Sequence, residues 1–240
     1  MHLKETPKTP TETLLSLDAT TCPLQTIQTP TPAKRKYLYF AYGSNLSPTQ
    51  MAQRCQINPT LSSKPLGIAF LPGWRWLICE AGYANVLPPQ GLRVGGQTSP
   101  AASKVPQSGA EDGVYGILYE MDVGDERILD VYEGVDWEAD CAEGGAVGVD
   151  VRPREQGEGD YNKWYLEAAI VRWFDAKDER VSQEKGSVFV LVYVDEERVV
   201  VSSPKAEYVP RMNRAIRECV GLSIEERWIE EVLRPFIPRE

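Results

Sequence analysis

The order in which strand-like and helix-like patterns follow one another is the feature that most limits the fold. Between residues 37 and 200, runs such as KYLYFAY, GVYGILYEMD and GSVFVLVYVDEERVV are rich in aromatic and β-branched residues, which predicts strands. Helical patterns follow the first run, follow the run near residue 115, and fill the segment after Tyr208. Strands in the middle, with helices interspersed and at the end, predict an α+β fold rather than a doubly wound sheet.

The stretch from Tyr37 to Met51, YLYFAYGSNLSPTQM, predicts a strand, a tight turn and a helix. Ser47 suits the N-cap of a helix from Pro48 to about Cys55, and Gln50 lies where the partner in a capping box belongs. The turn Gly43-Ser44-Asn45 can direct backbone N–H groups at a carboxylate or an oxyanion. An ordinary strand-to-helix connection is the alternative, and spacing alone leaves both readings open.

Two helices are expected at the end of the chain. The first begins at Tyr208 and ends at Gly221. The segment Ser223–Glu226 reads as a second capping box that opens the next helix.

Composition divides the chain into a tail and one domain. Residues 1–36 are rich in Thr and Pro and predict a disordered tail, because they cannot bury enough apolar surface to fold. The folded domain is expected at 37–240. Two segments within it, 90–112 and 138–160, are rich in small and turn-forming residues and predict flexible insertions.

Charge and residue usage exclude several functions. The net charge is −9 without a basic stripe, so nucleic acid and anionic membranes are not expected partners. His2 is the one histidine and lies in the tail, and the 5 cysteines form no C-x-x-C pair. These facts argue against a zinc site and against Ser-His-Asp or Cys-His catalysis. The first residues do not resemble a signal peptide and no run is long enough to span a bilayer, which favours a cytoplasmic location.

Glu133 is the strongest single candidate for an acid/base group. It lies at the last turn of a helix predicted over VGDERILDVYEGV, where the helix dipole disfavours an anion. Asp130 adds like charge, and Tyr132 and Val135 indicate partial burial, so each influence would raise the Glu133 pKa. An exposed glutamate at a frayed helix end is the alternative that sequence leaves open.

Three motifs in order carry a resemblance to a known family. YLYFAYGSNL, then GVYGILYEMD, then LDVYEGV resemble γ-glutamylcyclotransferases and their AIG2-like relatives, and the late segment from SPKAEYVPRM to the GL at 221–222 resembles the family's closing helix. The likeness runs from Tyr37 to about Pro238, apart from the two insertions. It implies a small mixed, mostly antiparallel β-barrel flanked by helices.

The resemblance also implies an activity and a site. The expected reaction cyclises a γ-glutamyl group to 5-oxoproline and releases the attached amino acid, without metal or cofactor. Glu133 corresponds to the family's acid/base. The substrate-binding positions are Tyr39, Phe40, Ala41, Tyr42, Gly43, Ser44, Tyr193 and Tyr208, and either Tyr161 or Tyr165 fits a further position in the pocket.

Two other functions stay open beside this one. A γ-glutamylamine cyclotransferase would use the same residues on a substrate with a different leaving amine. A non-catalytic AIG2-like binding module would keep the fold without turnover. The expected partner is a small-molecule γ-glutamyl substrate. The sequence leaves open whether the chain forms a homodimer.

Overall fold

The computed structural model describes residues 37–89, 92, 113–143, 147–177 and 186–239, which all belong to one compact unit. The predicted tail at 1–36 and nearly all of the predicted insertion at 90–112 lie outside the described residues. Within the described segments, no helix has the length and apolar character needed to cross a bilayer.

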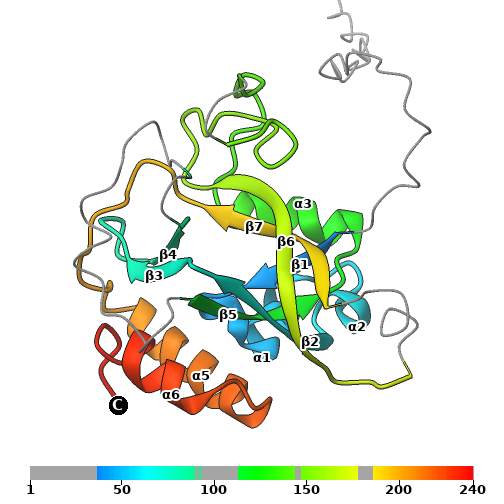
Figure 1. The fold of residues 1–240 in the computed structure, drawn as a ribbon, viewed down its shortest axis with the longest axis vertical. Helices are drawn as coiled ribbons and strands as arrows, with labels where there is room; N and C mark the ends of the chain where they lie inside the picture. The colour runs from blue at the N-terminus through cyan, green and yellow to red at the C-terminus, as the bar shows by residue number, and fades with distance from the viewer. Residues whose placement is uncertain (1–36, 90–91, 93–112, 144–146, 178–185, 240) are drawn as a thin grey trace, which may run out of the picture. The chain divides into compact units, whose positions relative to one another are not determined.

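Five strands close into a barrel in the order β1–β5–β2–β6–β7 (Figure 1). They are β1 (Leu38–Ala41), β2 (Pro65–Pro72), β5 (Gly113–Tyr119), β6 (Asn162–Trp173) and β7 (Ser187–Val194). Neighbouring strands run antiparallel except β1 and β7, whose parallel pairing closes the barrel. The predicted α+β class and the mostly antiparallel barrel are therefore confirmed.

A separate antiparallel pair contains β3 (Arg75–Ile78) and β4 (Ala84–Leu87), and it contacts the barrel through β5 and β7. Gly73, with φ of 75°, separates β2 from β3, and Gly82, with φ of 78°, lies in the turn before β4. Positive φ explains why glycine stands at both positions.

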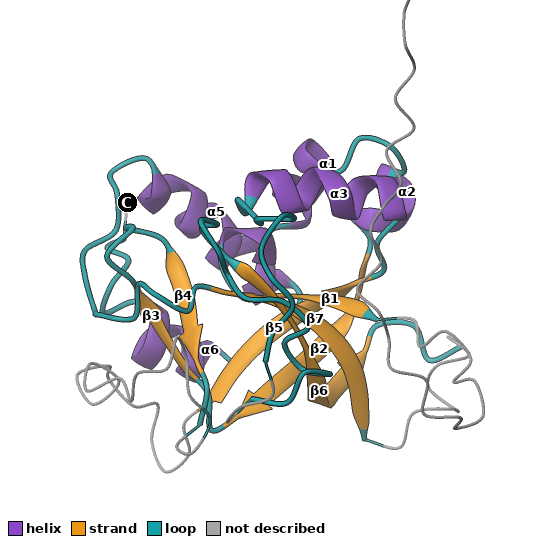
Figure 2. Cartoon of the chain, turned by 90° about the horizontal axis from the view of Figure 1, so that it is seen from above, coloured by secondary structure: helices purple, strands orange, loops and turns teal. Residues whose placement is uncertain are grey.

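The helical elements cover the barrel and the β3–β4 pair. They are η1 (Ser44–Leu46), α1 (Pro48–Arg54), α2 (Pro59–Ser62), α3 (Val123–Tyr132), α5 (Tyr208–Gly221), α6 (Glu226–Trp228) and the π-helical turn η3 (Ile229–Leu233). Figure 2 shows α1, α2, α3 and α5 on the same side of the barrel strands. The η1 turn contacts α5, and α1 contacts both α3 and α5, so segments far apart in sequence meet there.

Two glycines of β5 are required by packing. A Cβ on Gly113 would lie 1.9 Å from the Phe70 ring, and one on Gly116 would lie 2.5 Å from the Phe40 ring. Such overlaps cannot relax without moving an aromatic ring. The G-V-Y-G pattern thus serves the barrel core, where Phe40 is fully buried.

The predicted cap of α1 is confirmed, but its capping box is not closed as expected. The Ser47 hydroxyl accepts a hydrogen bond from the Gln50 N–H at 3.0 Å. The Gln50 side chain does not return to the Ser47 N–H, because that group donates to the Ser44 carbonyl. The Gln50 side-chain amide donates instead to Ser44 Oγ at 2.5 Å and to Asn45 Oδ1 at 3.0 Å, and these bonds connect the turn to the helix.

Ser47 also joins two helices, so its loss should be measurable. Its hydroxyl donates to Glu218 Oε2 of α5 at 2.7 Å. We expect Ser47→Ala to lower the free energy of unfolding by about 1–2 kcal/mol, since the cap and this bond both disappear. Urea denaturation would measure the change, with the exposed Ser202→Ala as control. Equal stability of the two variants would contradict the assignment.

The second predicted insertion is partly described, at 138–143 and 147–160. Cys141 and Arg154 form an isolated antiparallel bridge within it. Gln156 Nε2 donates to Asp195 Oδ1 at 3.1 Å, and Arg152 pairs with Glu196 at 3.2 Å. These contacts attach the described part of the segment to the loop after β7.

The second predicted capping box is wrong. Ser223 has φ of 65°, and its N–H donates to the Val220 carbonyl, so it belongs to the turn that ends α5. The N-cap of α6 is Glu225. The S-x-x-E spacing is present, but the left-handed backbone at Ser223 removes it from the cap position.

Candidate active site

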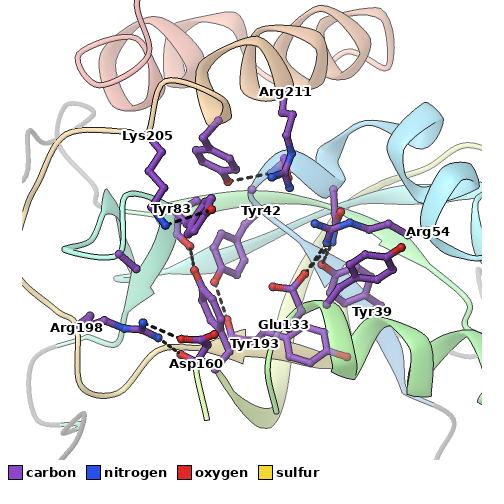
Figure 3. Close-up of a pocket in the computed structure, with 18 residues that line it drawn as sticks. Tyr39, Tyr42, Arg54, Tyr83, Glu133, Asp160, Tyr193, Arg198, Lys205 and Arg211 are labelled. Carbon is purple, nitrogen blue, oxygen red and sulfur yellow. Dashed lines mark hydrogen bonds and ion pairs between the residues drawn. The ribbon is translucent and has the colours of Figure 1, made fainter. Parts of the chain in front are cut away.

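A cavity of about 520 Å³ lies between the β1–η1 junction, the C-terminal end of α3, β4 and the start of α5 (Figure 3). This volume falls within the usual range for small-molecule sites. Seven of its lining residues are tyrosines, which give it aromatic walls with hydroxyl groups. Among these elements, the β1–η1 junction, the end of α3 and the start of α5 carry predicted motifs.

Glu133 enters this cavity from the end of α3. Gly134 follows with φ of 63° and ends the helix, and the Val135 N–H donates to the Asp130 carbonyl at 2.9 Å. The Glu133 side chain is 16% exposed, and its Oε1 lies 2.8 Å from Arg54 Nη1. Asn45 Nδ2 approaches the same oxygen at 3.3 Å. The carboxylate is therefore held between α1 and the η1 turn.

Burial raises the pKa of Glu133 above its ordinary value of 4.5, although Arg54 and Arg211 oppose the shift. The direction matches the sequence expectation, but the cause differs. Asp130 does not act as the expected like charge, because it is bound to other groups. Tyr132, which was expected to indicate burial, is 57% exposed. Loss of solvent around Glu133 is the dominant cause.

Asp130 belongs to a buried polar network behind the cavity wall. Its carboxylate, 1% exposed, lies 3.0 Å from Lys163 Nζ of β6. The Tyr193 hydroxyl of β7 donates to Asp130 Oδ1 at 2.6 Å, and the Tyr42 hydroxyl donates to the Tyr193 carbonyl at 2.6 Å. The network joins α3 to the barrel one turn before Glu133, and so fixes the helix end that carries the carboxylate.

The Gly43-Ser44-Asn45 turn faces the start of α5. The Ser44 N–H donates to the Tyr208 hydroxyl at 3.2 Å. A Cβ on Gly43 would lie 3.0 Å from the same hydroxyl oxygen, so glycine permits the close approach. Ser44 Oγ also receives Arg211 Nη2 at 3.0 Å. Among the described residues, the Gly43 N–H has no acceptor, and the Tyr208 hydroxyl has no acceptor for its own proton.

Most of the sequence-predicted positions meet at this cavity. The cavity-lining members are Tyr39, Tyr42, Gly43, Ser44, Glu133, Tyr193 and Tyr208. Phe40 and Ala41 are the exceptions: both are fully buried and neither lines the cavity. Phe40 points to the opposite face of the strand and packs on Gly116.

The structure also separates the two tyrosines that the sequence left open. Tyr161 lines the cavity and its hydroxyl donates to the Ala84 carbonyl at 2.8 Å. Tyr165, four residues later and within β6, does not line the cavity. Its ring lies 4.7 Å from that of Tyr37.

Several lining residues have no counterpart in the sequence expectations, and the basic ones form the clearest group. Arg54, Arg198, Lys205 and Arg211 line the cavity, against two acids, Glu133 and Asp160. Arg54 is the last residue of α1, a helix that the sequence predicts, so the sequence could have drawn attention to it. The other three lie outside any motif. The lining therefore carries a net positive charge in a chain of net charge −9, which favours anionic groups in the cavity.

Comparison with known proteins adds little to this geometry. No protein-family model matches the chain, and no curated protein matches it. A structural match is YkqA from Bacillus subtilis, with a TM-score of 0.43 and 16% sequence identity. The match covers 76% of this chain and 48% of YkqA, so the chain corresponds to about half of that protein. A likeness of this degree says nothing about activity.

The fold and the cavity together define a class: an α+β barrel protein with a buried carboxylate in a basic, tyrosine-lined cavity. Among the described residues, no group of three or more His, Cys, Asp or Glu side chains is arranged to hold a metal ion.

Proposed function

We propose that this protein is a γ-glutamylcyclotransferase, which converts a γ-glutamyl-amino acid to 5-oxoproline and the free amino acid. The observation that carries the proposal is the position of Glu133. Its buried carboxylate, with a raised pKa, accepts a hydrogen bond from the Asn45 side chain, which directly follows the strand-turn segment that the resemblance assigns to substrate binding. The proposal therefore combines one acid/base with one anion-binding turn in a single cavity.

Binding follows from the charged groups of the substrate. The γ-glutamyl α-carboxylate would pair with Arg211, which already lies 3.0 Å from Ser44 Oγ, and with the Gly43 N–H. The α-ammonium would then face Glu133. This arrangement bends the glutamyl chain so that its amine approaches the γ-carbonyl carbon. A well-oriented intramolecular attack of this kind is worth roughly 7–11 kcal/mol of the barrier.

The reaction needs proton transfer but no external reactant. The α-amine nitrogen forms a bond to the γ-carbonyl carbon, and the bond from that carbon to the leaving nitrogen breaks. Two protons leave the attacking nitrogen and two arrive on the leaving nitrogen. The Glu133 carboxylate would carry them one at a time, as general base and then as general acid.

Negative charge develops on the carbonyl oxygen during attack. The Tyr208 hydroxyl is the proposed donor to it, because burial raises the pKa of Tyr208 to about 12 and keeps the group protonated. Its oxygen accepts from the Ser44 N–H, which orients the hydroxyl toward the cavity. A positioned donor of this kind stabilises the oxyanion without reorganisation.

A panel of γ-glutamyl compounds tests the proposal. Purified protein is incubated with γ-glutamyl-alanine and with Nε-(γ-glutamyl)-lysine, and 5-oxoproline is measured. We expect release from γ-glutamyl-alanine. Release only from the lysine compound would favour a γ-glutamylamine cyclotransferase, and binding without release from either would favour a non-catalytic module.

The raised pKa of Glu133 makes a prediction about pH. Because the base must be deprotonated, kcat/KM should fall with acidification around a pKa above 4.5. Arg54 favours the charged carboxylate, so Arg54→Met should raise the Glu133 pKa and move the acid limb to higher pH. pH–rate profiles of both proteins measure the shift.

Arg227→Met is the control for this shift, since Arg227 is exposed and pairs with Glu231 away from the cavity. Its profile should coincide with that of the wild type. An acid limb that stays in place in Arg54→Met, or moves to lower pH, would contradict Glu133 as the titrating group.

A further inference from the structure

The basic residues of the cavity divide into two pairs. Arg54 is bound to Glu133 at 2.8 Å, and Arg198 is bound to Asp160 at 2.8 Å. Lys205 and Arg211 have no carboxylate partner among the described residues. Their polar contacts are neutral: Lys205 Nζ lies 3.3 Å from the Tyr83 hydroxyl, and Arg211 contacts Gln50 and Ser44.

The two unpaired cations lie at different ends of one aromatic pair. Lys205 Nζ lies 4.4 Å from the centre of the Tyr83 ring, and Arg211 Cζ lies 5.2 Å from the centre of the Tyr208 ring. The two rings pack edge to face with centres 5.1 Å apart. Figure 3 shows Lys205 and Arg211 entering the cavity from separate points above Tyr42 and Glu133.

Arg211 belongs to the end of the cavity that holds Glu133. It contributes to lowering the pKa of that carboxyl, whereas Lys205 is not among the main influences on it. Arg211 also contacts Ser44, the neighbour of the Asn45 that reaches Glu133. Lys205 instead contacts the β3–β4 turn, where its N–H donates to the Gly82 carbonyl at 3.1 Å.

We propose that Lys205 binds the carboxylate of the leaving amino acid and so selects γ-glutamyl-amino acids over γ-glutamyl-amines. This inference rests on the proposed function, in which Arg211 takes the α-carboxylate of the glutamyl group. A γ-glutamyl-amino acid carries a second carboxylate on the leaving side, and Lys205 is the cation left to receive it. Each charged group of the substrate then meets an opposite charge.

Two features of Lys205 define how strong this selection is. The side chain is exposed, so water and salt screen the pair. Glu207 accepts a hydrogen bond from the Tyr83 hydroxyl at 2.7 Å, and among the described residues it is not paired with Lys205. We therefore expect about a fivefold preference, in KM rather than kcat, that shrinks as salt is added.

The matched substrates are γ-glutamyl-alanine and γ-glutamyl-ethylamide, which differ only by the carboxylate of the leaving group. The wild type should show the lower KM for γ-glutamyl-alanine. In Lys205→Met the KM ratio of the two substrates should fall to near one, and in Lys205→Arg it should be retained. Lys64→Met, an exposed lysine outside the cavity, is the control and should keep the wild-type ratio.

An unchanged ratio in Lys205→Met, or an equal loss on both substrates, would overturn the inference while leaving the proposed function intact. If the wild type releases 5-oxoproline from neither compound, the proposed function fails instead. Calorimetric titration of both compounds then tests Lys205 directly. A preference for γ-glutamyl-alanine that Lys205→Met abolishes supports the inference, and absence of that preference overturns it.

Discussion

Glu133→Gln should reduce 5-oxoproline release by about 10³-fold, since acid/base groups typically contribute 10²–10⁴-fold. Glutamine has the shape of glutamate and still accepts a hydrogen bond from Arg54, but it cannot take a proton from the α-ammonium. The melting temperature should change little, and the affinity for γ-glutamyl-alanine should fall far less than turnover, because only the charge that faces the α-ammonium is lost among the binding contacts. Steady-state kinetics together with calorimetric binding would measure these effects.

The control for this variant is the other acid of the cavity. Asp160→Asn removes a carboxylate that is 65% exposed and paired with Arg198, on the side of the cavity away from Arg54 (Figure 3). We expect it to keep turnover within about tenfold of the wild type. If Asp160→Asn and Glu133→Gln lose activity equally, the assignment of the acid/base to Glu133 is wrong.

Among the substitutions proposed here, Lys163→Met should cause the largest loss in the free energy of unfolding. Lys163, whose side chain is 7% exposed, pairs with the buried Asp130 and also contacts Glu126. Its removal leaves the Asp130 charge without its cation, and breaking a buried pair costs about 3–5 kcal/mol. That is a large part of the 5–15 kcal/mol that typically separates folded and unfolded states. Urea denaturation at neutral pH would measure it.

The origin of that loss can be isolated by pH and by a second substitution. Burial already raises the pKa of Asp130, and losing Lys163 should raise it further. Below the raised pKa the carboxyl is neutral, so the deficit of Lys163→Met should shrink as the pH falls. The double variant Lys163→Met with Asp130→Asn should recover part of the stability. A single-variant loss below about 1 kcal/mol would contradict this account of the network.

Local sequence signals predict much of this fold. The aromatic runs form β1, β5 and β7 where expected, and the Ser47 cap and Pro48 begin α1 as predicted. The helix before Glu133 also ends at Gly134, whose positive φ explains the stop. These features depend on a few neighbouring residues, which is why pattern alone finds them.

The side-chain partners in the site depend on contacts between distant segments and are harder to predict. Asp130 looks like a neighbour that repels Glu133, but Lys163, 33 residues later, binds it. Arg54 and Glu133 are 79 residues apart in sequence. No local pattern reports such pairs, so the excess of cations in the cavity appears only in three dimensions.

Contiguous motifs also overstate a binding site. The resemblance predicts that every residue from Tyr39 to Ser44 binds the substrate. Alternation along β1 sends Phe40 to the other face, where it packs on Gly116, while Tyr39 lines the cavity. The positions after the strand, Gly43 and Ser44, escape this alternation and do line the cavity.

The most direct test of the central claim is the product analysis of γ-glutamyl-alanine incubated with purified protein, without added metal or cofactor. We expect 5-oxoproline and free alanine in equal amounts from the wild type, and about 10³-fold slower formation of both from Glu133→Gln. Release of free glutamate in place of 5-oxoproline, or equal rates from the two proteins, would contradict it.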